Sequence, residues 1–486
     1  MTGLLIAGTS SDAGKSLFVT GLCRVARRRG IDVAPFKAQN MSNNSMVCAD
    51  GSEIGRAQYL QAIAAGLEPT SAMNPVLLKP GSDRRSFIVL CGEPAGTLEA
   101  GEYTTGRRQL AEAAWATYEE LSRAHDLVIC EGAGSPAEIN LRRGDYTNMG
   151  LARRFDLPVV LIGDIDRGGV LASIFGTWGL LDEQDRALLS GYVINKFRGD
   201  QSILDPGLEE ITRRTGLANL GVLPWLEDVW LDGEDSLSLG NLTRTSSRSD
   251  DQTALSVAVI RLPRISNATD VDALAQEPGV RVVVTTSPAD VAAADLVVLP
   301  GSRSTLSDLA WLHRTGIADA LQSRARAGLP ILGICGGFQM LGRRIEDAVE
   351  SDDSQPGLGL LPIRVEFHPQ KVLRRPEGTW QGNPVDGYEI HHGRCSEEAD
   401  ARSMGAVDFL EGLQLDATWG TMWHGSLESD GFRRAWLREV AAQAGREWEP
   451  VPGAPGFAER REQMIDITAN AIELAIDVEH LLNLAR

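Results

Sequence analysis

The chain has 486 residues, too many for one hydrophobic core, so its length predicts two or three domains that each bury a full core. Its 47 lysines and arginines against 66 aspartates and glutamates give a net charge of −19, which argues against binding to nucleic acid or to an anionic membrane surface. The six cysteines form no CxxC pair, so they predict a reducing compartment, with neither a disulfide scaffold nor a metal cage.

The N-terminus and the hydropathy of the chain predict a soluble protein. Residues 1–8 lack the basic flank and the cleavage site of a signal peptide, and no run of eighteen apolar residues occurs. We therefore expect a cytoplasmic protein that does not associate with a membrane.

Residues 1–235 predict an α/β domain built on a parallel sheet. Short apolar runs alternate with helical patterns in this region, and burial on both faces is typical of parallel strands. The clearest runs lie at residues 127–130, 158–162 and 191–194.

A glycine-rich loop, Gly8–Ser16, follows the first apolar run and opens a helical pattern. The backbone N–H groups of such a loop cradle phosphates, while Lys15 would reach the outer phosphates and the Ser16 hydroxyl would hold Mg²⁺. The spacing departs from a Walker A loop, because Thr9 stands where the first glycine is expected and Gly8 comes one place earlier. A Gly/Ser turn before a helix is the alternative. The strand-loop-helix context favours ATP binding by Thr9, Gly14, Lys15 and Ser16.

Polar residues follow several of the predicted strands. Glu131 comes directly after the run at 127–130, at the edge where open α/β sheets bind ligands, and is the predicted Mg²⁺ partner of Ser16. An ordinary glutamate that caps the strand is the alternative. Asn195 and Lys196 follow the run at 191–194, where P-loop proteins often contact an adenine or guanine edge, so we take both as ATP-binding candidates.

Other polar residues are candidates for the phosphate or substrate region. Segment 35–44 holds four amides and a lysine after a predicted strand at 32–34, so its side chains should face the same crevice, although amide-rich loops usually make turns. Asp145, Asp164 and Asp166 lie at predicted strand ends or in loops, and for each of them the roles of metal ligand and of solvated loop carboxylate stay equally open. The candidates from these segments are Lys37, Gln39, Asn40, Asp145, Asp164 and Asp166.

A polar stretch at 236–253 predicts a linker, and a second α/β alternation follows over 254–445. Its apolar runs lie at 255–260, 280–284, 296–299 and 330–334 and predict another parallel sheet. Residues 446–486 predict a helical extension, whose apolar stretch at 464–482 we expect to pack on the second domain.

Cys335 stands between an apolar run and a helical pattern, with glycine on its helical side and small neighbours around it. Such neighbours permit a sharp turn that exposes a nucleophile in strained geometry, and a helix N-terminus favours the thiolate. A buried cysteine at the end of a core strand is the alternative. Because glycines serve no packing purpose there, we interpret Cys335 as a nucleophile.

A nucleophilic cysteine needs a base, and His424 is the best placed candidate. It ends a short strand-like run before a glycine, whereas a lone histidine elsewhere is more often structural. Residues 388–393 alternate like a strand, so one of His391 and His392 should face the core and the other the solvent. Gly301 and Gly336 follow predicted strands and are candidates to donate backbone N–H groups to an oxyanion.

Together these segments resemble the cobyric acid synthase family, the glutamine-dependent amidases of cobalamin biosynthesis, over nearly the whole chain. The resemblance rests on GTSSDAGKS, PFKAQNMSNNS, EIGRAQ (53–58), EGAGSPAEINL, DIDRGG, NKFRGD, LPGSRST, GICGGFQMLG, YEIHHG and the WHG at His424. It adds Glu53 to the substrate or phosphate region. It implies an N-terminal P-loop domain of the dethiobiotin synthetase type, with the same extra loop residue, and a C-terminal class I glutamine amidotransferase domain with a flavodoxin-like fold.

The resemblance also implies the reaction. Cys335 and His424 would release ammonia from glutamine, and the P-loop domain would use MgATP to activate four carboxylates, b, d, e and g, of adenosylcobyrinic acid a,c-diamide as acyl phosphates. ATP, Mg²⁺, glutamine and the corrinoid are therefore the expected ligands. Most such amidotransferases carry His-x-Glu, but Ser426 stands two residues after His424, so no third catalytic member is assigned and Glu428 is only a candidate.

Three alternatives stay open at this point. The first is the related synthase that amidates the a and c positions, which has both domain types. The second belongs to another class, a P-loop ATPase switch with a degenerate amidotransferase domain, which should lack the nucleophile at Cys335. The third is a lipid-linked cell-wall amidating enzyme, whose two activities usually lie on separate chains.

Overall fold

The computed structural model describes residues 3–81, 85–99, 106–227, 229, 254–349 and 353–485. The chain divides into two compact units. Unit 1 comprises Met1–Ser42, Cys48–Leu231 and Arg461–Arg486, and unit 2 comprises Asn43–Val47 and Asp232–Arg460. The predicted linker at 236–253 lies outside the described residues. None of the helices in the described ranges combines the length and the apolar character that a bilayer crossing requires.

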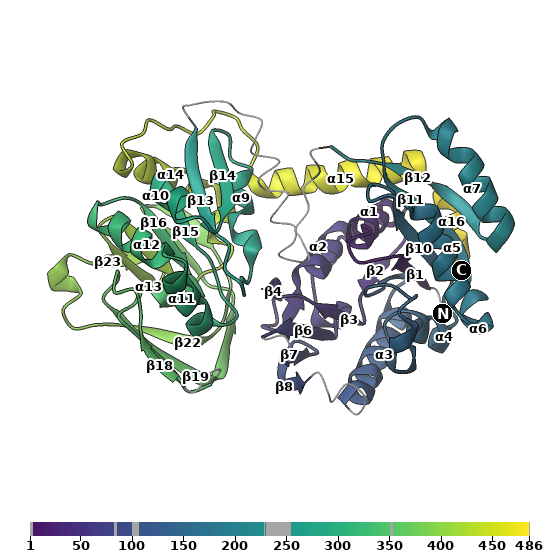
Figure 1. Cartoon of the computed structure of the whole chain (residues 1–486), viewed down its shortest axis with the longest axis horizontal. Coiled ribbons are helices and arrows are strands. Elements are labelled where there is room, and N and C mark those ends of the chain that lie inside the picture. The colour runs from purple at the N-terminus through teal and green to yellow at the C-terminus, as the bar shows by residue number, and fades with distance from the viewer. Residues whose placement is uncertain are drawn as a thin grey trace. The chain divides into compact units, whose positions relative to one another are not determined.

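The centre of unit 1 is a six-stranded sheet (Figure 1). Its strands are β1 (Gly3–Gly8), β2 (Val33–Phe36), β9 (Leu127–Glu131), β10 (Val159–Asp164), β11 (Leu189–Phe197) and β12 (Ala218–Pro224). They pair in the order β12-β11-β10-β1-β9-β2, and every pair is parallel. The parallel sheet predicted from the apolar runs is confirmed.

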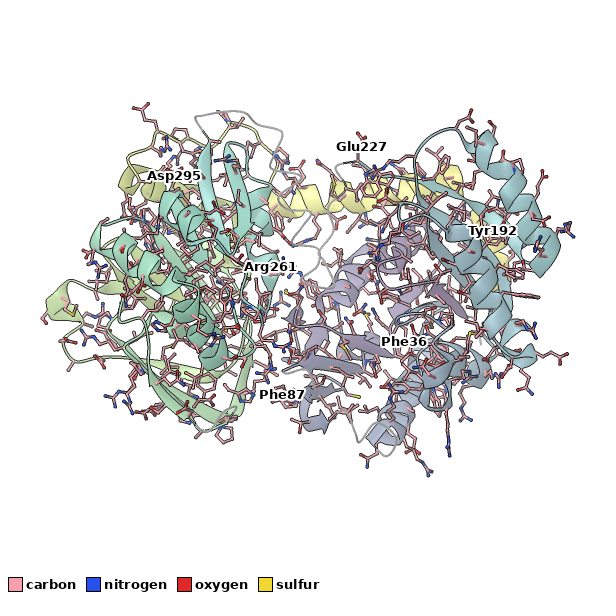
Figure 2. The ribbon with its side chains drawn as sticks, viewed as in Figure 1. Phe36, Phe87, Tyr192, Glu227, Arg261 and Asp295 are labelled. Atoms are coloured by element: carbon pink, nitrogen blue, oxygen red, sulfur yellow. The ribbon has the colours of Figure 1, made fainter. Side chains whose placement is uncertain are left out.

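Helices cover both faces of this sheet, so unit 1 has two hydrophobic cores. Leu5 and Ala7 of β1 face one core, and the alternate residues Leu4 and Ile6 face the other, as the two-residue period of a strand requires. Phe36 and Tyr192, labelled in Figure 2, belong to the first core. The helices around the sheet are α1 (Lys15–Arg28), α2 (Arg56–Ala65), α3 (Gly106–Ala124), α4 (Met149–Phe155), α5 (Val170–Leu180), α6 (Glu183–Arg186) and α7 (Gln201–Thr215).

The C-terminal helices α15 (Phe457–Ala475) and α16 (Val478–Leu484) pack on unit 1, not on the second domain as the sequence led us to expect (Figure 1). Ile465, Ala469 and Ile472 of α15 enter the second core of unit 1. A Cβ atom added at Gly21 of α1 would come within 2.6 Å of the Ile472 side chain, so a glycine there permits the close approach of the two helices. The apolar period predicted the helix correctly but carried no information about its partner.

A smaller sheet completes unit 1. Its strands are β3 (Gln39–Met41), β6 (Val76–Pro80), β7 (Arg85–Leu90) and β8 (Glu93–Glu99), in that order. Unit 1 also contains the short strand β5 (Glu53–Gly55) and the 3₁₀ turns η1 (Ser71–Met73) and η2 (Ile139–Gly144). Strand β4 (Ser45–Val47) lies in the segment Asn43–Val47, which belongs to unit 2.

Unit 2 has a seven-stranded central sheet. Its strands are β13 (Leu255–Ile260), β14 (Val280–Thr285), β15 (Leu296–Leu299), β16 (Ile331–Ile334), β23 (Val407–Phe409), β24 (Gly412–Leu415) and β25 (Thr418–Thr421). The parallel part has the order β14-β13-β15-β16-β25, which is the flavodoxin-like order 2-1-3-4-5. Strands β24 and β23 extend it in antiparallel fashion, which the apolar runs did not predict.

Helices and a second sheet surround this core. The helices are α9 (Asp272–Ala275), α10 (Pro288–Ala293), α11 (Thr305–Arg314), α12 (Ile317–Arg326), α13 (Gly336–Leu341) and α14 (Asp430–Gln443), with the 3₁₀ turns η5 (Ala268–Val271), η6 (Arg402–Met404) and η7 (Ser426–Glu428). The other strands are β17 (Arg344–Asp347), β18 (Asp353–Pro356), β19 (Ile363–Arg374), β20 (Glu377–Trp380), β21 (Asn383–Asp386) and β22 (Glu389–Glu397). They form the sheet β18-β17-β19-β22 and the pair β20-β21.

The packing of α15 on unit 1 gives a first prediction. Ile472→Ala should destabilise unit 1 by about 2–5 kcal/mol, because it removes a fully buried side chain between α15 and α1. Hydrogen–deuterium exchange of the β1 amides, followed by mass spectrometry, measures this loss within unit 1. Leu474→Ala is the matched control, since Leu474 lies on the same helix and is 89% exposed. Equal exchange in the two variants would contradict the packing of α15 on this core.

Candidate active sites

Cys335 connects β16 to α13 in a strained turn. Its φ is 49° and its ψ is −110°, a conformation that non-glycine residues rarely adopt and that costs about 1–3 kcal/mol. A Cβ atom at Gly336 would lie 2.7 Å from the Ser302 backbone nitrogen, and one at Gly337 would lie 1.9 Å from the Leu299 carbonyl oxygen. Only glycine fits at these two positions, because the loop after β15 passes directly beside the turn.

His424 follows β25, the strand that pairs in parallel with β16. The backbone N–H of His424 donates to the Tyr388 carbonyl at 2.9 Å, and the Tyr388 N–H donates to the His424 carbonyl at the same distance. The imidazole stacks on the Tyr388 ring with 5.3 Å between ring centroids and 26° between planes. This arrangement fixes the backbone and the ring plane of His424 at the carboxyl edge of the sheet, where β16 delivers Cys335.

Asp270, on η5 after the first strand of unit 2, supplies the carboxylate behind His424. Its Oδ2 lies 2.7 Å from Nδ1 of His424, and its Oδ1 accepts the Gly425 backbone N–H at 2.9 Å. The sequence interpretation missed this residue, and Glu428 as the third member was wrong because Asp270 takes the Nδ1 position. Asp270 is 154 residues from His424 in the chain, and one loop aspartate gives no sequence signal at that distance.

The electrostatics of His424 follow from this pair. Burial by itself would lower the pKa of His424, but the Asp270 carboxylate, and next the Cys335 sulfur, outweigh it and raise the pKa to about 10. With Nδ1 committed to Asp270, Nε2 is the ring atom left to exchange a proton with Cys335. Nε2 has no hydrogen-bond partner among the described residues.

The loop after β15 lies beside both groups, where the two predicted oxyanion donors meet. A Cβ atom at Gly301 would come within 3.0 Å of the His424 ring, and Gly336 faces the Ser302 backbone. The Ser302 hydroxyl donates to Asp308 at 2.6 Å and accepts the Ser304 backbone N–H at 3.0 Å. Burial raises the pKa of Asp308 to about 6. These bonds hold the loop in one conformation against the Cys335 turn.

Of the other histidines of unit 2, His391 and His392 have backbone partners. Nδ1 of His391 lies 2.8 Å from the Gly393 carbonyl oxygen, and Nδ1 of His392 lies 3.0 Å from the His368 carbonyl oxygen. The His391 side chain is 8% exposed, as expected for the one of the pair that faces the core, but His392 is also partly buried, so the expectation that the other faces the solvent was wrong. Strand β22 bends where its pairing with β19 shifts in register, which breaks the alternation.

In unit 1 the phosphate loop and Glu131 meet at the carboxyl ends of β1 and β9. The Ser16 hydroxyl donates to Glu131 Oε1 at 2.8 Å. Nζ of Lys15 lies over the loop and donates to the Ser10 carbonyl at 3.3 Å. A Cβ atom at Gly8 would lie 3.0 Å from that Nζ, so the glycine leaves room for the lysine.

Glu131 also receives Lys37 and Gln61. Lys37 Nζ lies 2.8 Å from Oε1, and Gln61 Nε2 donates to Oε2 at 2.6 Å. Burial would raise the pKa of Glu131, but the Lys37 ammonium, with help from Lys15, lowers it, so the carboxylate stays ionised in a fully buried position. Lys37 was among the predicted residues, whereas Gln61, on the third position after the EIGRAQ segment, was missed.

Ser16 and Glu131 fit the predicted Mg²⁺ site, because a hydroxyl and an ionised carboxylate are the oxygen donors that Mg²⁺ prefers. Within the described ranges there is no cluster of three or more histidine, cysteine or acidic side chains able to hold a metal. A magnesium ion here would therefore take its remaining ligands from nucleotide phosphates and water.

The predicted nucleotide-binding residues Thr9, Gly14, Asn195 and Lys196 lie around the same loop. The Thr9 backbone N–H donates to the Ile162 carbonyl of β10 at 3.0 Å. Asn195 Nδ2 donates to the Ala13 carbonyl at 2.9 Å, and a Cβ atom at Gly14 would collide with this amide at 2.0 Å. Lys196 Nζ donates to the Asp12 carbonyl at 2.8 Å, so β11 and the phosphate loop are tied together.

Two of the candidate aspartates join this region. Asp164 Oδ2 lies 2.6 Å from Lys196 Nζ, and its Oδ1 accepts the Asp166 backbone N–H at 2.9 Å. Asp166 itself pairs with Arg198 at 3.2 Å. These contacts make Asp164 a partner of Lys196 at the edge of the loop.

Asp145 has a structural role instead. It accepts the backbone N–H groups of Thr147 and Asn148 at 2.9 Å, and that of Gly150 at 2.9 Å, at the start of α4. Carboxylates favour this position because the first N–H groups of a helix lack partners within it.

The remaining candidates lie in a buried polar group beside α2. Gln39 Oε1 accepts the Tyr146 hydroxyl at 2.5 Å, Asn40 Nδ2 donates to Gln58 Oε1 at 2.9 Å, and Glu53 forms an ion pair with Lys79. The amide-rich segment therefore forms specific side-chain bonds, more than the turns that such loops usually make.

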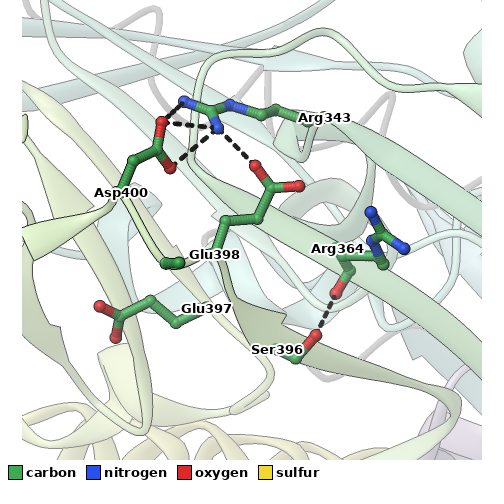
Figure 3. Close-up of a pocket in the computed structure, with 7 residues that line it drawn as sticks. Arg343, Arg364, Ser396, Glu397, Glu398 and Asp400 are labelled. Carbon is green, nitrogen blue, oxygen red and sulfur yellow. Dashed lines mark hydrogen bonds and ion pairs between the residues drawn. The ribbon is translucent and has the colours of Figure 1, made fainter.

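The structure also contains a cavity of about 450 Å³, lined by Arg343 just before β17, by Arg364 of β19 and by residues 396–400 at and after the end of β22. Figure 3 shows that the Arg343 guanidinium already bonds Glu398 and both carboxylate oxygens of Asp400. None of the predicted site residues lines this cavity. It is an ion-pair cluster on the surface of unit 2 and not the site of the chemistry.

Comparison with known families and proteins matches both units. Residues 256–432 match the CobB/CobQ-like glutamine amidotransferase domain, and residues 4–239 match the CobQ/CobB/MinD/ParA nucleotide binding domain. The cobyric acid synthase of Cutibacterium acnes is 65% identical over 100% of both chains. That of Mycolicibacterium gilvum is 53% identical over 100% of this chain and 97% of its own. That of Nocardia farcinica is 54% identical over 98% and 95%.

A second prediction tests the buried pair. In Asp270→Asn the pKa of His424 should fall from about 10 to 6.5 or lower, because burial then acts on the ring without the carboxylate. A ¹³C NMR titration of the histidine rings measures the change, and the other histidines are internal controls. An unchanged His424 titration would remove Asp270 from this role.

The raised pKa of His424 also makes the stability of the fold depend on pH. The pKa of His424 is raised in the folded chain above its ordinary value of 6.5, so the pair stabilises the fold fully below that pH. The contribution is lost as the pH rises through about 10, so the gap in unfolding free energy between the chain and Asp270→Asn should narrow from neutral pH upward.

Proposed function

The chain belongs to the cobyric acid synthase family, and we propose that it amidates the b, d, e and g carboxylates of adenosylcobyrinic acid a,c-diamide with ammonia from glutamine, driven by MgATP. The observation that carries the proposal is the triad in unit 2, where Asp270 holds His424 at the carboxyl edge beside the strained turn of Cys335. The phosphate loop with Lys15, in unit 1, supports the ATP-dependent half.

The glutaminase half uses Cys335 as nucleophile. Its thiolate attacks the carboxamide carbon of glutamine, and the C–N bond breaks as His424 gives a proton from Nε2 to the departing ammonia. The product is a glutamyl thioester. His424 then takes a proton from water, whose oxygen attacks the thioester and releases glutamate and the Cys335 thiolate. Asp270 stabilises the protonated ring, because its carboxylate accepts from Nδ1.

The tetrahedral intermediates of both steps carry a negative oxygen. Backbone N–H groups near Gly301 and Gly336 are the proposed donors to it, supported by the close approach of their two loops beside His424. The hydrogen bonds from Ser302 to Asp308 keep the first loop in place.

The synthetase half activates a carboxylate that is otherwise a poor acyl acceptor. A corrinoid carboxylate oxygen attacks the γ-phosphorus of ATP, ADP leaves, and an acyl phosphate results. Ammonia attacks its carbonyl carbon, and inorganic phosphate leaves as the amide forms. Lys15 and the loop N–H groups neutralise charge on the transferring phosphoryl group. Magnesium bound by Ser16 and Glu131 would offset the charge of the phosphates.

The triad argues against the alternative of a switch ATPase with a degenerate amidotransferase domain, since nucleophile, base and orienting carboxylate are all present. The six cysteines, none of which forms a disulfide, support a reducing compartment and hence a cytoplasmic enzyme. The remaining alternative, the a,c-diamide synthase, differs from the proposed activity in which carboxylates of the corrinoid it converts to amides.

A third prediction tests the function directly. The enzyme, incubated with the corrinoid a,c-diamide, MgATP and glutamine, should produce four successive and equal small mass decreases of the corrinoid, one for each acid-to-amide exchange, by mass spectrometry. Cys335→Ala should lose the reaction with glutamine and keep it with ammonium chloride, because only ammonia release needs the thiolate. Equal loss with both nitrogen donors would refute the division of labour between the two sites.

A fourth prediction concerns Lys15. Lys15→Ala should lower amidation by at least about a hundredfold with glutamine and with ammonium chloride alike, because the phosphoryl transfer precedes both. ADP release and corrinoid mass measure the loss. Arg28→Ala, on the exposed last turn of the same helix, is the control and should amidate normally. ATP-dependent amidation by Lys15→Ala at the normal rate would exclude this lysine from the chemistry.

A further inference from the structure

A short segment of the N-terminal part of the chain belongs to unit 2. Asn43–Val47 is assigned to unit 2, although Met1–Ser42 before it and Cys48 after it belong to unit 1. Ser45 is fully buried, and Asn44 is 4% exposed. Polar residues this deeply buried need specific partners, because an unpaired buried amide costs about 1–3 kcal/mol.

The partners of this segment are the first residues of the turn η5. The Ser45 backbone N–H donates to Asn267 Oδ1 at 2.9 Å, and Asn44 Oδ1 accepts the Ala268 backbone N–H at 3.1 Å. The Asn267 backbone N–H donates to the Asn43 carbonyl at 3.4 Å. The hydrogen bonds of the two asparagines are thus reciprocal: the side chain of each accepts a backbone N–H from the residue that follows the other.

This exchange replaces the usual cap of the turn. Asn267 stands at the N-cap position of η5 with a φ of 49°, but its side chain caps no N–H of its own turn. Asn44 satisfies the first N–H of η5 instead. The conformation of η5 therefore depends on a residue more than two hundred positions away in the sequence.

Asp270 is the functional residue of this turn. Its backbone N–H donates to the Asn267 carbonyl at 3.0 Å, and its carboxylate bonds His424 and the Gly425 N–H. A shift of η5 would move the carboxylate relative to the imidazole. Strand β4 of the same segment also contacts β22. Met46 and Val47 of this strand are buried.

The segment is joined by a short length of chain to the phosphate site. Lys37, seven residues before Asn44, bonds Glu131 at 2.8 Å, and the Ser42 backbone N–H is held by the Leu78 carbonyl at 3.0 Å.

We propose that Asn43–Val47 positions the Asp270 turn for glutamine hydrolysis, an inference that rests on the proposed function. Asn44 and Asn267 are positioning residues, since they touch neither substrate nor the reacting atoms.

The test compares Asn44→Ala, which removes the acceptor for Ala268, with Asn44→Asp, which keeps it. Glutamate release by Asn44→Ala should fall by about tenfold to a hundredfold in kcat, with the KM for glutamine within about twofold, because Asp270 positions the base and not the substrate. Asn44→Asp should restore the rate.

Two controls separate this proposal from the function and from misfolding. Asn383→Ala, which loses only weak bonds to the Trp380 and Gln381 carbonyls in unit 2, should behave like the unsubstituted enzyme. Amidation of the corrinoid by Asn44→Ala with ammonium chloride should be normal. Asn267→Gly, which keeps the positive φ and loses the side chain, should reproduce the loss if Asn44→Ala does not fold.

Normal glutamate release by both Asn44→Ala and Asn267→Gly would overturn the positioning role. Failure of the unsubstituted enzyme to amidate the corrinoid with ammonium chloride would overturn the proposed function instead, so the outcomes are distinguishable.

Discussion

The glutaminase chemistry depends on one buried ion pair, the contact of 2.7 Å between Asp270 and His424. Both side chains are removed from water, so each charge is stable only with the other in place. The pair fixes which nitrogen of the ring faces the nucleophile and raises the pKa of the ring well above its usual range. Without the carboxylate the same burial would favour a neutral imidazole of undefined tautomer.

Parallel sheets make such a pair possible from distant parts of the chain. Asp270 follows β13, the loop of Gly301 follows β15, Cys335 follows β16 and His424 follows β25, and these four strands lie in that order in one sheet. Their carboxyl ends share one edge, so residues up to 154 positions apart meet there. The phosphate site repeats the principle, with the loop after β1 beside the end of β9.

Sequence reasoning succeeded where the signal is local. The glycines around Cys335 and the Gly-Lys-Ser of the phosphate loop are required by backbone geometry within a few residues, so the residue types reveal the turn. Several parallel strands of both sheets were predicted from their local apolar runs, whereas the antiparallel strands β23 and β24 were not. Asp270 and the packing of α15 were missed, because each depends on which distant surface an unremarkable aspartate or apolar stripe meets in the folded chain.

Each site is organised around a buried carboxylate that does no bond-making itself. Asp270 orients His424, and Glu131 receives Ser16, Lys37 and Gln61. Such a carboxylate is costly to bury and is retained only with its full set of donors. One stretch of chain, from Lys37 to Val47, supplies a donor to Glu131 and the cap of the Asp270 turn. These eleven residues therefore serve both sites, Lys37 as the ion-pair partner of Glu131 and Asn44 as the cap of the turn that carries Asp270.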